Sequence, residues 1–364
     1  MNPPVATALD LPYPSPGGSV ELFLDLYTGS RPLIPASAYM LDGGSTDPVP
    51  GGLRLLRVPG KALEGRAFDR YVEELHLALA SAVDPTDISI LHLHHLAFGA
   101  SPALLRALPS ARRIALVHGT DLLYAETYGD QLAILRHCAD AADAIVVPTG
   151  AMADRLLALA PGTGRRKIRL IPWGVPDHLL TGPLIAPRPR RTSHLRLLYA
   201  GRLTAEKGVE ALLHALSSAP AVELSVAAPS DQFHALAPLV HRLGVHVRYL
   251  GWLRRPQLWK IFPEHDVLVM PSTTLEAMGL VALEAQACGL PILYQPVPGL
   301  TESVGASGMA TDFTTPVALA RDLERLRTTP GLLGALRAAG RANAARYPLS
   351  ATAAALTDLG NQLN

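Results

Sequence analysis

The sequence predicts an α/β fold with two parallel-sheet domains. Short apolar, β-branched segments alternate with longer segments of helical period, which is typical of parallel strands joined by helices. The same alternation starts again near residue 195. A chain of 364 residues is also long for one core and fits two domains of about 150–200 residues each.

The first half of the chain contains six short apolar segments that we expect to be strands. The longer segments between them include two predicted helices, Phe68–Ala82 and Ala133–Ala142. The first strand runs into a stiff turn rich in proline and glycine, which opens into a helix over Val20–Tyr27. The predicted strands are Val5–Leu9, Leu53–Val58, Ile88–Leu93, Ile114–Val117, Ala144–Val147 and Ile168–Ile171.

The second half has the same organisation, with helices predicted at Glu206–Leu216 and about Leu280–Ala287. Residues 181–194, between the halves, are rich in proline and arginine, which favours a linker because proline lacks the backbone donor of strands and helices. We therefore place the first domain at 1–180 and the second at 195–348. The predicted strands are Leu195–Ala200, Val222–Val226, Val245–Leu250, Val267–Met270 and Ile292–Tyr294.

Composition and charge exclude several classes of protein. Hydrophobic residues make up 49% of the chain and charged residues 17%, which excludes a disordered protein. A formal net charge of +1 gives no global field to attract nucleic acid.

The N-terminal residues lack a secretory signal and no segment is apolar enough to span a membrane, so we expect a cytoplasmic protein. Residues 101–113 combine leucines with arginines, but Pro109 interrupts them and favours a packing helix over a membrane-binding one.

The most informative segment is 271–291, which follows the apolar strand Val267–Met270. It therefore lies at the carboxyl edge of a parallel sheet, where open α/β folds bind ligands. Gly279 begins a predicted helix whose first backbone N–H groups, at Leu280 and Val281, form an anion site.

Two glutamates of this segment are candidate ligand-binding residues. Glu276 precedes the helix and can accept hydrogen bonds from sugar hydroxyls. Glu284 lies within the helix, where its carboxylate can take two vicinal hydroxyls. The alternative is that both glutamates only favour the helix N-terminus. Glu284 fits that alternative less well, because its apolar neighbours mean that the charge needs a partner.

A second group of candidates follows the strand Leu195–Ala200. Arg202 and Lys207 lie five residues apart in the loop and first helical turn. Two fixed cations there can stabilise the charge that gathers on a diphosphate leaving group. The alternative is a pair of exposed, unpaired side chains.

Gly17 and Gly18 stand between the first strand and the first helix, where a backbone without side chains can approach a ligand closely. A plain turn explains these glycines as well. The chain contains no G-x-G-x-x-G and no G-x-x-x-x-G-K-[ST], which disfavours a dinucleotide dehydrogenase and a P-loop NTPase.

Histidines follow the central strands of the first half. His118 follows a strand, where it can bind a sugar or transfer a proton, and we assign the nearby Asp121 and His94 to the acceptor side. A hydrogen-bonded loop histidine is the alternative. His92, His94 and His95 suggest a metal at first sight, but His95 points to the other strand face and no further ligand is identifiable. We therefore expect no metal site.

These segments, in this order, resemble the retaining GT-B glycosyltransferases of family 4. The resemblance spans nearly the whole chain, and its most specific elements are the glutamates at 276 and 284 followed by Ala-Cys-Gly-Leu-Pro, and the Gly-Arg…Glu-Lys-Gly stretch at 201–208. It implies two Rossmann-like domains facing across a cleft, retention of anomeric configuration and no metal requirement. It also implies a final helix, about 349–364, that crosses back to the first domain.

The resemblance implies a role for each candidate. Arg202 and Lys207 would neutralise the donor diphosphate, and Glu284 would hold the ribose hydroxyls. Glu276 and the backbone from Gly279 to Val281 would bind the transferred sugar. The remaining implied contacts are His118 beside that sugar, Gly17 and Gly18 near the phosphates and the acceptor, and Tyr249–Trp252, including Gly251 and Trp252, beside the base.

The sequence departs from the family pattern at three places. Met278 stands where many relatives have an aromatic residue, Trp173-Gly174 replaces the usual Asn-Gly turn, and Ala227-Ala228-Pro229 replaces a glycine-rich turn. These departures leave the identity of the donor open.

The expected activity is retaining transfer of a hexosyl-type sugar from a nucleotide-diphosphate sugar to a hydroxyl of a small polar acceptor, such as an aminocyclitol antibiotic precursor. Two alternatives remain open, namely transfer to a lipid or cell-wall precursor at a membrane surface, and a nucleotide-sugar epimerase on the same fold. The nucleotide sugar is a co-substrate, and we expect no cofactor and no nucleic-acid partner. A homodimer remains open.

Overall fold

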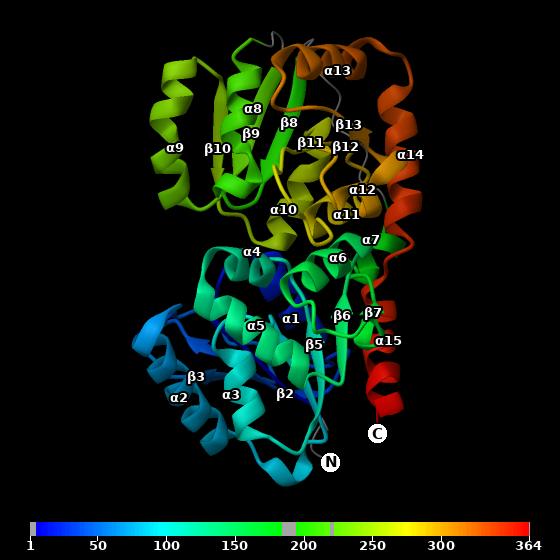
Figure 1. Ribbon diagram of the computed structural model, residues 1–364. Coiled ribbons are helices and arrows are strands. Elements are labelled where there is room, and N and C mark those ends of the chain that lie inside the picture. Colours follow the sequence, from blue (N-terminus) through cyan, green and yellow to red (C-terminus); the bar gives the residue numbers. More distant parts are fainter. Residues whose placement is uncertain (1–4, 184–193, 219–221, 364) are drawn as a thin grey trace. The chain divides into compact units, whose positions relative to one another are not determined.

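The computed structural model describes residues 5–183, 194–218 and 222–363. The chain divides into two compact units, Met1–Trp173 with Leu349–Asn364, and Gly174–Pro348 (Figure 1). Residues 174–180, which the sequence places in the first domain, belong to the second unit. Val175 pairs with Pro348, and Arg341 donates to the carbonyls of Leu180 and Gly182. Most of the predicted linker, 184–193, lies outside the described residues.

The first unit is built on a seven-stranded parallel sheet with the order β3-β2-β1-β4-β5-β6-β7. Its strands are β1 (Val5–Tyr13), β2 (Ala36–Asp42), β3 (Leu53–Leu56), β4 (Ile90–His94), β5 (Arg112–Leu116), β6 (Ala144–Val147) and β7 (Ile168–Leu170). Its helices are α1 (Gly18–Tyr27), α2 (Gly65–Ala82), α3 (Ala100–Ala107), α4 (Thr120–Thr127), α5 (Gly129–Ala141), α6 (Gly150–Leu159) and α15 (Leu349–Leu363), with short 3-10 turns at Pro85–Asp87 and Arg165–Lys167.

Strand β2 was not predicted from the sequence. Its residues ASAYMLD mix small and polar side chains with apolar ones, so they show neither a clear alternation nor a continuous apolar run. The strand is nevertheless paired on both sides, with β1 and β3, and Tyr39 and Met40 are buried. Its tertiary position, rather than its composition, therefore defines it.

The second unit is built on a six-stranded parallel sheet with the order β10-β9-β8-β11-β12-β13. Its strands are β8 (Leu195–Ala200), β9 (Val222–Ala227), β10 (Val247–Gly251), β11 (Val267–Met270), β12 (Ile292–Tyr294) and β13 (Met309–Ala310). Its helices are α7 (Asp177–Thr181), α8 (Val209–Leu216), α9 (Ser230–Leu243), α10 (Arg255–Ile261), α11 (Leu280–Ala287), α12 (Leu300–Ser303), α13 (Pro316–Thr328) and α14 (Leu332–Ala344), with 3-10 turns at Ala205–Lys207, Phe262–Glu264 and Gly305–Ser307.

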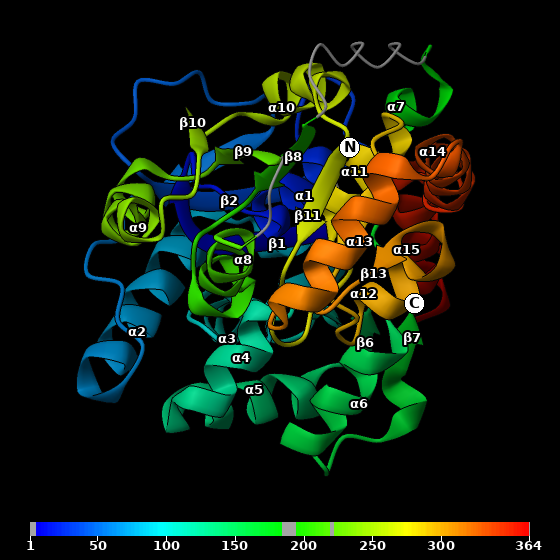
Figure 2. The same ribbon diagram turned by 90° about the horizontal axis from the view of Figure 1, so that it is seen from above.

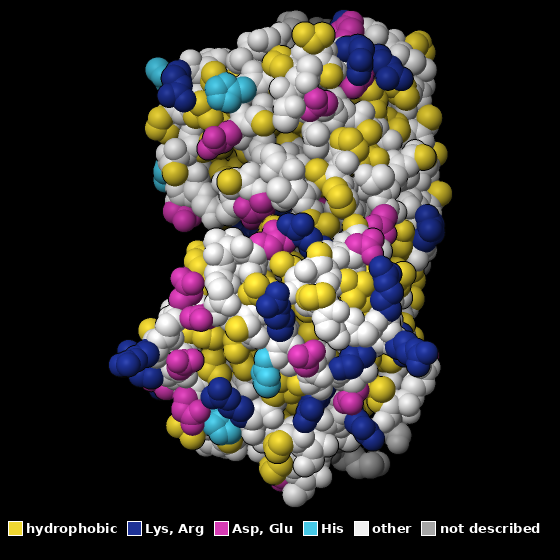
Figure 3. Space-filling model, in the orientation of Figure 1, with side chains coloured by type: hydrophobic (Ala, Val, Ile, Leu, Met, Phe, Trp, Pro, Cys, Tyr) yellow, Lys and Arg dark blue, Asp and Glu magenta, His cyan; other side chains and the backbone are white. Residues whose placement is uncertain are grey.

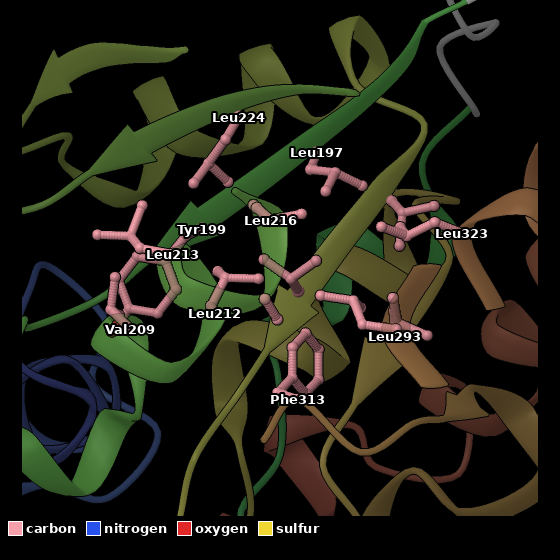
Figure 4. Close-up of a cluster of buried hydrophobic side chains, with 14 of the residues drawn as sticks. Leu197, Tyr199, Val209, Leu212, Leu213, Leu216, Leu224, Leu293, Phe313 and Leu323 are labelled. Atoms are coloured by element: carbon pink, nitrogen blue, oxygen red, sulfur yellow. The ribbon is translucent and has the colours of Figure 1, made fainter. Parts of the chain in front are cut away.

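Two apolar cores cover the two faces of this second sheet. Alternate residues of β8 point to opposite faces, so Leu197 and Tyr199 pack with α8 and α13, whereas Leu198 packs with α10 and α11. Figure 4 shows the first core, with leucines of α8 beside Phe313 and Leu323. In the view of Figure 2, α8 and α9 lie on one side of β8–β10 and α10 lies on the other. Burial on both faces explains why these strands read as continuous apolar runs.

The strand orders give each sheet a switch point, where the chain reverses the direction in which it adds strands. It lies between β1 and β4 in the first sheet and between β8 and β11 in the second. In open α/β sheets, ligands bind outside the carboxyl ends of the strands at such points. The loops after β1, β4 and β5, and after β8 and β11, are therefore where functional side chains are expected.

The C-terminal helix α15 belongs to the first unit and contacts β5. It is close-packed at Gly360, where an added Cβ would lie 2.8 Å from a methyl carbon of Ile90. The sequence predicts a helix over 349–364 that crosses back to the first domain, and α15 belongs to that unit.

The segment 101–113 does not form one amphipathic helix. Helix α3 ends at Ala107, and Arg112 and Arg113 lie in β5. Leu104 and Leu105 are buried, so α3 packs within the unit.

Among the described helices, none combines the length and apolar character needed to cross a bilayer. On the face shown in Figure 3, Lys and Arg side chains alternate with Asp and Glu on each unit, in keeping with the balanced net charge.

Candidate active-site residues

The ion pair between Lys207 and Glu276 joins the loops that follow β8 and β11. The Lys207 ammonium donates to Oε1 of Glu276, and the Ser272 hydroxyl donates to the same oxygen at 2.7 Å. No described residue donates to the other oxygen, Oε2. Glu276 is buried, and the pair lies at the switch point of the second sheet. The two predicted residues of opposite charge are therefore in direct contact.

Two glycines allow close approach to the loop after β11, Gly208 from the loop after β8 and Gly299 from the loop after β12. Gly208 has a left-handed φ of 67°, and a Cβ there would lie 2.0 Å from the Pro271 carbonyl oxygen. Gly299 has a φ of 88°, and a Cβ there would lie 1.6 Å from the carbonyl oxygen of Glu276. Any other residue at either position would displace the backbone next to the ion pair. The local geometry of Lys207 and Glu276 thus depends on the two glycines.

The charge state of Glu276 is set by its partners. Burial by itself would raise the pKa of this carboxyl, but the Lys207 charge and the hydrogen bonds from Lys207 and Ser272 outweigh burial and lower the pKa. Glu276 is therefore ionised near neutral pH. The negative charge of the buried Glu276 is thus held against the positive charge of the Lys207 ammonium, whose side chain is 25% exposed.

Arg202 lies at the edge of the same site. Its nearest acidic partner is Glu206, with 3.8 Å between Nη2 and Oε1, and both side chains are about one third exposed. The buried Tyr199 hydroxyl donates to the Arg202 carbonyl, which fixes the backbone rather than the guanidinium. Arg202 is thus more available to a ligand than Lys207.

Helix α11 begins at the predicted position. Gly279 is its N-cap residue, with a φ of 65°, and Leu280 and Val281 are its first two residues. The first backbone N–H groups of a helix have no partner within the helix, and its dipole places partial positive charge there. Gly279, the N-cap of α11, follows Glu276 by three residues, so the first N–H groups of the helix come soon after the ion-paired glutamate in the chain.

Glu284 is almost fully buried and already has partners. Arg255 of α10 donates to Oε1 through Nη2 at 2.7 Å and through Nε at 3.0 Å. The Trp259 indole N–H donates to Oε2 at 2.8 Å. The partner that the sequence predicts for this charge is therefore supplied by the protein itself.

The residues predicted to border a base lie after β10. Gly251 has a φ of 77°, and Trp252 is 40% exposed, which makes it one of the more exposed large apolar side chains. Tyr249 stacks on Phe233 of α9, with ring centroids 4.0 Å apart, and donates to the Ala228 carbonyl. Trp252 is therefore free to stack on a planar ligand, whereas Tyr249 is occupied in packing.

In the first unit, three histidines and a tyrosine form a chain of hydrogen bonds. The Tyr27 hydroxyl bonds to Nδ1 of His92 at 2.8 Å and to Nε2 of His94 at 3.0 Å. His94 Nδ1 then bonds to His118 Nε2 at 2.9 Å. His118 also stacks on Trp173, with centroids 5.6 Å apart. We call His92, Tyr27, His94 and His118 the imidazole chain.

Burial keeps the imidazole chain uncharged. It lowers the pKa of His92 to about 4 and that of His118 to about 3, and it lowers the pKa of His94 well below its usual range. The pKa of Tyr27 is raised by the same cause. At neutral pH the chain therefore contains three neutral rings and one neutral phenol.

Asp121 organises the loop that carries His118. The side chain is fully buried, and its carboxylate accepts from the backbone N–H groups of Gly119 at 2.8 Å, Leu96 at 3.0 Å and His118 at 3.2 Å. Burial raises the pKa of Asp121 to about 6, although these bonds act in the opposite direction. Asp121 and His94 are thus engaged within the protein, and only His118 of the three is partly exposed.

The loop after β4 has strained backbone beside His118. His95 and Phe98 both have left-handed φ angles, 64° and 69°, which non-glycine residues seldom adopt. The His95 ring lies 4.6 Å from that of His118 and 5.3 Å from that of Phe98. The rings of His94 and His95 both lie next to that of His118, with centroids 5.0 and 4.6 Å away. Across the described residues, no three His, Cys, Asp or Glu side chains are grouped to hold a metal ion.

Gly17 and Gly18 lie where the sequence places them. Gly17 is the N-cap of α1, with a φ of 144°, and Gly18 is the first residue of that helix. A Cβ at Gly17 would meet nothing within 4 Å, so packing does not require the glycine, although its φ favours one.

Comparison with known families decides the classification. Residues 35–179 match the family model described as Glycosyltransferase Family 4, and residues 185–344 match the model described as Glycosyl transferases group 1. Together these matches cover most of both units. The chain belongs to glycosyltransferase family 4. It is a nucleotide-sugar-dependent glycosyltransferase with the GT-B fold.

Curated relatives of this family 4 glycosyltransferase include D-inositol 3-phosphate glycosyltransferase 1 from Catenulispora acidiphila. It is 27% identical over 89% of this chain and 82% of the relative. The D-inositol 3-phosphate glycosyltransferase from Streptomyces bingchenggensis is 32% identical over 69% of this chain, and that match spans 55% of the relative.

Solved structures show the same fold. Sucrose-phosphate synthase from Thermosynechococcus elongatus has a TM-score of 0.78 at 20% identity, covering 100% of this chain and 99% of that one. Anabaena HepE in complex with UDP and glucose has a TM-score of 0.72 at 17% identity, covering 98% of each chain. At this level of identity the likeness concerns the fold of the family 4 glycosyltransferase and not its substrates.

Several partners in this family 4 glycosyltransferase could not be selected from the sequence. Arg255 and Trp259 are 29 and 25 residues before Glu284, and Tyr27 is 67 residues before His94. The available signals were weak ones, namely an arginine and a tryptophan one turn apart after β10, and a tyrosine on the apolar face of α1. Trp173 was noticed only as a departure from the family pattern, although it packs on His118.

Proposed function

We propose that the enzyme transfers a hexosyl-type sugar from a nucleotide-diphosphate sugar to a hydroxyl of a small polar acceptor, with retention of anomeric configuration. The observation that carries this proposal is the set formed by Lys207, Glu276 and the start of α11 at the switch point of the second sheet. It places a cation, a helix N-terminus and a carboxylate in one site. A sugar diphosphate presents the complementary groups, an anion and several hydroxyls.

In this proposal the cations act on the leaving group. Lys207 and the more exposed Arg202 stabilise the negative charge that develops on the diphosphate as the bond to the sugar breaks. The first N–H groups of α11 bind phosphate or sugar oxygens. Oε2 of Glu276, which accepts no bond from a described residue, accepts from a hydroxyl of the transferred sugar.

The transfer itself is proposed to be a direct displacement on one face of the sugar. The acceptor oxygen bonds to the anomeric carbon while the bond from that carbon to the phosphate oxygen breaks, and the acceptor proton passes to the leaving phosphate. No protein nucleophile and no metal is required. His118, held neutral in the imidazole chain, is suited to hydrogen-bond an uncharged hydroxyl.

The acceptor class is supported by the relatives. The curated relatives named above are D-inositol 3-phosphate glycosyltransferases, so their names point to a cyclic polyol as acceptor. Among solved structures, HepE binds UDP and glucose, which supports a nucleoside diphosphate hexose as donor. We propose a polyol or aminocyclitol acceptor of this size, as used in natural-product biosynthesis.

The test is a transfer assay with EDTA present, in which UDP-, GDP-, ADP-, CDP- and dTDP-sugars are each combined with myo-inositol, inositol phosphates and aminocyclitols. The expected result is one acceptor-dependent glycoside whose anomeric configuration, read from NMR coupling constants, matches that of the donor. A product of opposite configuration would refute retention. A donor sugar that changes its own configuration without any acceptor would instead indicate an epimerase.

A further inference from the structure

Residues 60–65 form an irregular segment that reaches the carboxyl end of the first sheet. They lie between β3 and α2, yet the Lys61 ammonium donates to the Asp10 carbonyl of β1 at 2.7 Å and lies 3.4 Å from Oδ2 of its carboxylate. Asp10 comes two residues after Ala8, the last residue of β1 that pairs with β4. The segment therefore contacts the switch point between β1 and β4, where open α/β sheets bind ligands. We call residues 60–65 the strap.

The strap is held by side chains of other elements. Among the described residues, none forms a backbone–backbone hydrogen bond with residues 60–63. The Leu63 carbonyl instead accepts from Nε2 of Gln131 at 2.5 Å, and the Gly65 N–H donates to Oδ2 of Asp130 at 2.6 Å. Most of the strap is exposed. Exposed segments with few backbone hydrogen bonds are typical of the parts of a protein that open locally.

Two side chains that hold the strap also hold the strained loop after β4. Oδ2 of Asp10, beside the Lys61 ammonium, accepts from the Gly99 N–H at 2.9 Å. Gln131, which donates to the strap, accepts from the Phe98 N–H at 2.8 Å through Oε1. Asp10 and Gln131 are both buried. The strap and the loop are thus connected through two buried side chains.

Lys61 is the counter-ion of the buried Asp10. No other described cation pairs with this carboxylate, and the Lys61 ammonium also lies 5.1 Å from the centre of the Phe98 ring. The left-handed φ of Phe98, 69°, persists only while its surroundings hold it. Lifting the strap removes the counter-ion from Asp10 and the cation from Phe98, so it also loosens the loop.

Glycines stand at both ends of the strap. Gly60 has a φ of 73° and Gly65 a φ of 65°, and a Cβ at either position would meet nothing within 4 Å. The backbone therefore has room to rotate at both ends.

We propose that the strap opens and closes over the switch point of the first sheet, that the ion pair between Lys61 and Asp10 holds it closed, and that residues 98–99 open together with it. In the closed state the strap fixes the strained loop, which also carries His95 beside His118. In the open state Asp10 and the carboxyl ends of β1 and β4 are uncovered. The inference goes beyond the proposed function and does not depend on it, because the motion belongs to the enzyme without substrate.

The experiment is hydrogen exchange of the wild-type enzyme without substrate, read at the backbone amides of Gly65, Phe98 and Gly99. Each of these amides donates to a side chain and is protected while the strap is closed. We expect the three amides to share one protection factor, at least about tenfold lower than that of the buried strand β6, which opens only with the whole unit.

Lys61→Met removes the charge and keeps the length of the side chain. The acceptors of the Gly65 and Phe98 amides remain in this variant, so a change at these amides reports the opening of the strap and not the loss of a partner. We expect protection at both amides to fall about 10- to 100-fold, the equivalent of one hydrogen bond to a charged group, while β6 changes less.

Gln131→Met tests the second connection, and Arg57→Met is the control. Gln131→Met leaves the acceptors of Gly65 and Gly99 in place and should lower the protection of both amides by at least about threefold, the smaller effect of a neutral hydrogen bond. Arg57→Met removes the exposed ion pair with Asp42 just before the strap and should leave all three amides unchanged.

Three outcomes would overturn the inference. If Lys61→Met lowers protection at Gly65 and not at Phe98, the strap opens without the loop. If the three wild-type amides are as well protected as β6, the strap opens only when the unit unfolds. If the losses in Lys61→Met and Gln131→Met are matched at β6, these side chains only stabilise the unit as a whole.

Discussion

The carboxyl ends of the two sheets carry opposite kinds of chemistry. In the second unit, the side chains are charged and paired, as in Lys207 with Glu276 and Arg255 with Glu284. In the first unit, the imidazole chain from His92 to His118 is neutral and contains no counter-ion, although Asp10 of β1 pairs with Lys61 and the Asp121 carboxyl lies beside His118. Two domains of the same architecture thus present very different electrostatic environments.

The difference has a physical explanation in terms of what each site binds in our proposal. A nucleotide diphosphate carries several negative charges, so fixed cations and a helix N-terminus stabilise it and its departure. An acceptor hydroxyl carries no charge, and a neutral ring can hydrogen-bond it without attracting the diphosphate. The fold is shared, and the side chains at the strand ends determine the function.

The largest expected effect comes from the charged site. Lys207→Ala should lower kcat by about a hundredfold or more, because the cation stabilises charge that forms in the transition state and because Glu276 is left without its partner. Steady-state kinetics on a variant shown by circular dichroism to be folded measures this effect. Lys260→Ala is the matched control. Near-normal turnover in Lys207→Ala would show that the charged site does not act on the leaving group.

The next effect concerns the neutral site and is a dependence of stability on pH. The folded pKa values of His92, His94 and His118 are lowered below the unfolded value of about 6.5. At these three sites the unfolded chain therefore binds more protons as the pH falls from about 6.5 toward 4, and the free energy of unfolding decreases by up to about 1.4 kcal/mol per pH unit for each histidine. Asp121, whose pKa is raised to about 6, opposes this decrease with one group against three.

Urea unfolding between pH 7.5 and pH 5 measures this slope. His94→Gln should reduce the slope, and His246→Gln, at an exposed position, should leave it unchanged. An unfolding free energy that rises on acidification over this range would contradict the assignment of the three rings as neutral.

A smaller effect is expected when the imidazole chain is interrupted. Tyr27→Phe removes the hydroxyl between His92 and His94 and leaves two buried ring nitrogens without this partner. The cost should be about 1–3 kcal/mol in the free energy of unfolding at pH 7.5. Tyr13→Phe, which removes the hydroxyl that donates to the Pro48 carbonyl at an exposed position, should cost less. Equal losses in the two variants would mean that the chain adds little stability.

The smallest effect is expected at the exposed edge of the charged site. Glu206→Ala removes the acidic partner of Arg202, and because that pair is separated by 3.8 Å and is about one third exposed, stability should change by less than about 1 kcal/mol. Binding of a nucleoside diphosphate should be unchanged or tighter. A strong loss of binding would show that Glu206, and not only Arg202, contacts the donor.

The strands and the charged loops were predictable from local sequence. The apolar runs at 195–200, 267–270 and 292–294 are buried on both faces, so their composition alone marked them as strands, and the bounds of α11 follow from the glycine before it and the apolar residues within it. Strand β2 was not predicted, because its composition is mixed and its pairing with β1 and β3 defines it.

The partners of the predicted residues were not predictable in the same way. Glu284 was recognised as a buried charge in need of a partner, but nothing in one sequence says that Arg255 and Trp259 supply it. Likewise His94 and His118 were noticed because they follow strands, whereas Tyr27 comes from a helix 67 residues before His94. Contacts between distant segments depend on how the helices pack, and that information is not contained in periodicity or spacing.

The central claim is that the donor diphosphate binds at the charged carboxyl end of the second sheet. The most direct test is calorimetric titration of UDP and GDP, with EDTA present, into the wild-type enzyme, Lys207→Ala and His94→Gln. We predict that one of the two nucleotides binds the wild-type enzyme, that Lys207→Ala weakens this binding by about tenfold or more, and that His94→Gln leaves it within about threefold. A loss of affinity in His94→Gln that equals the loss in Lys207→Ala, or unchanged affinity in Lys207→Ala, would contradict the claim.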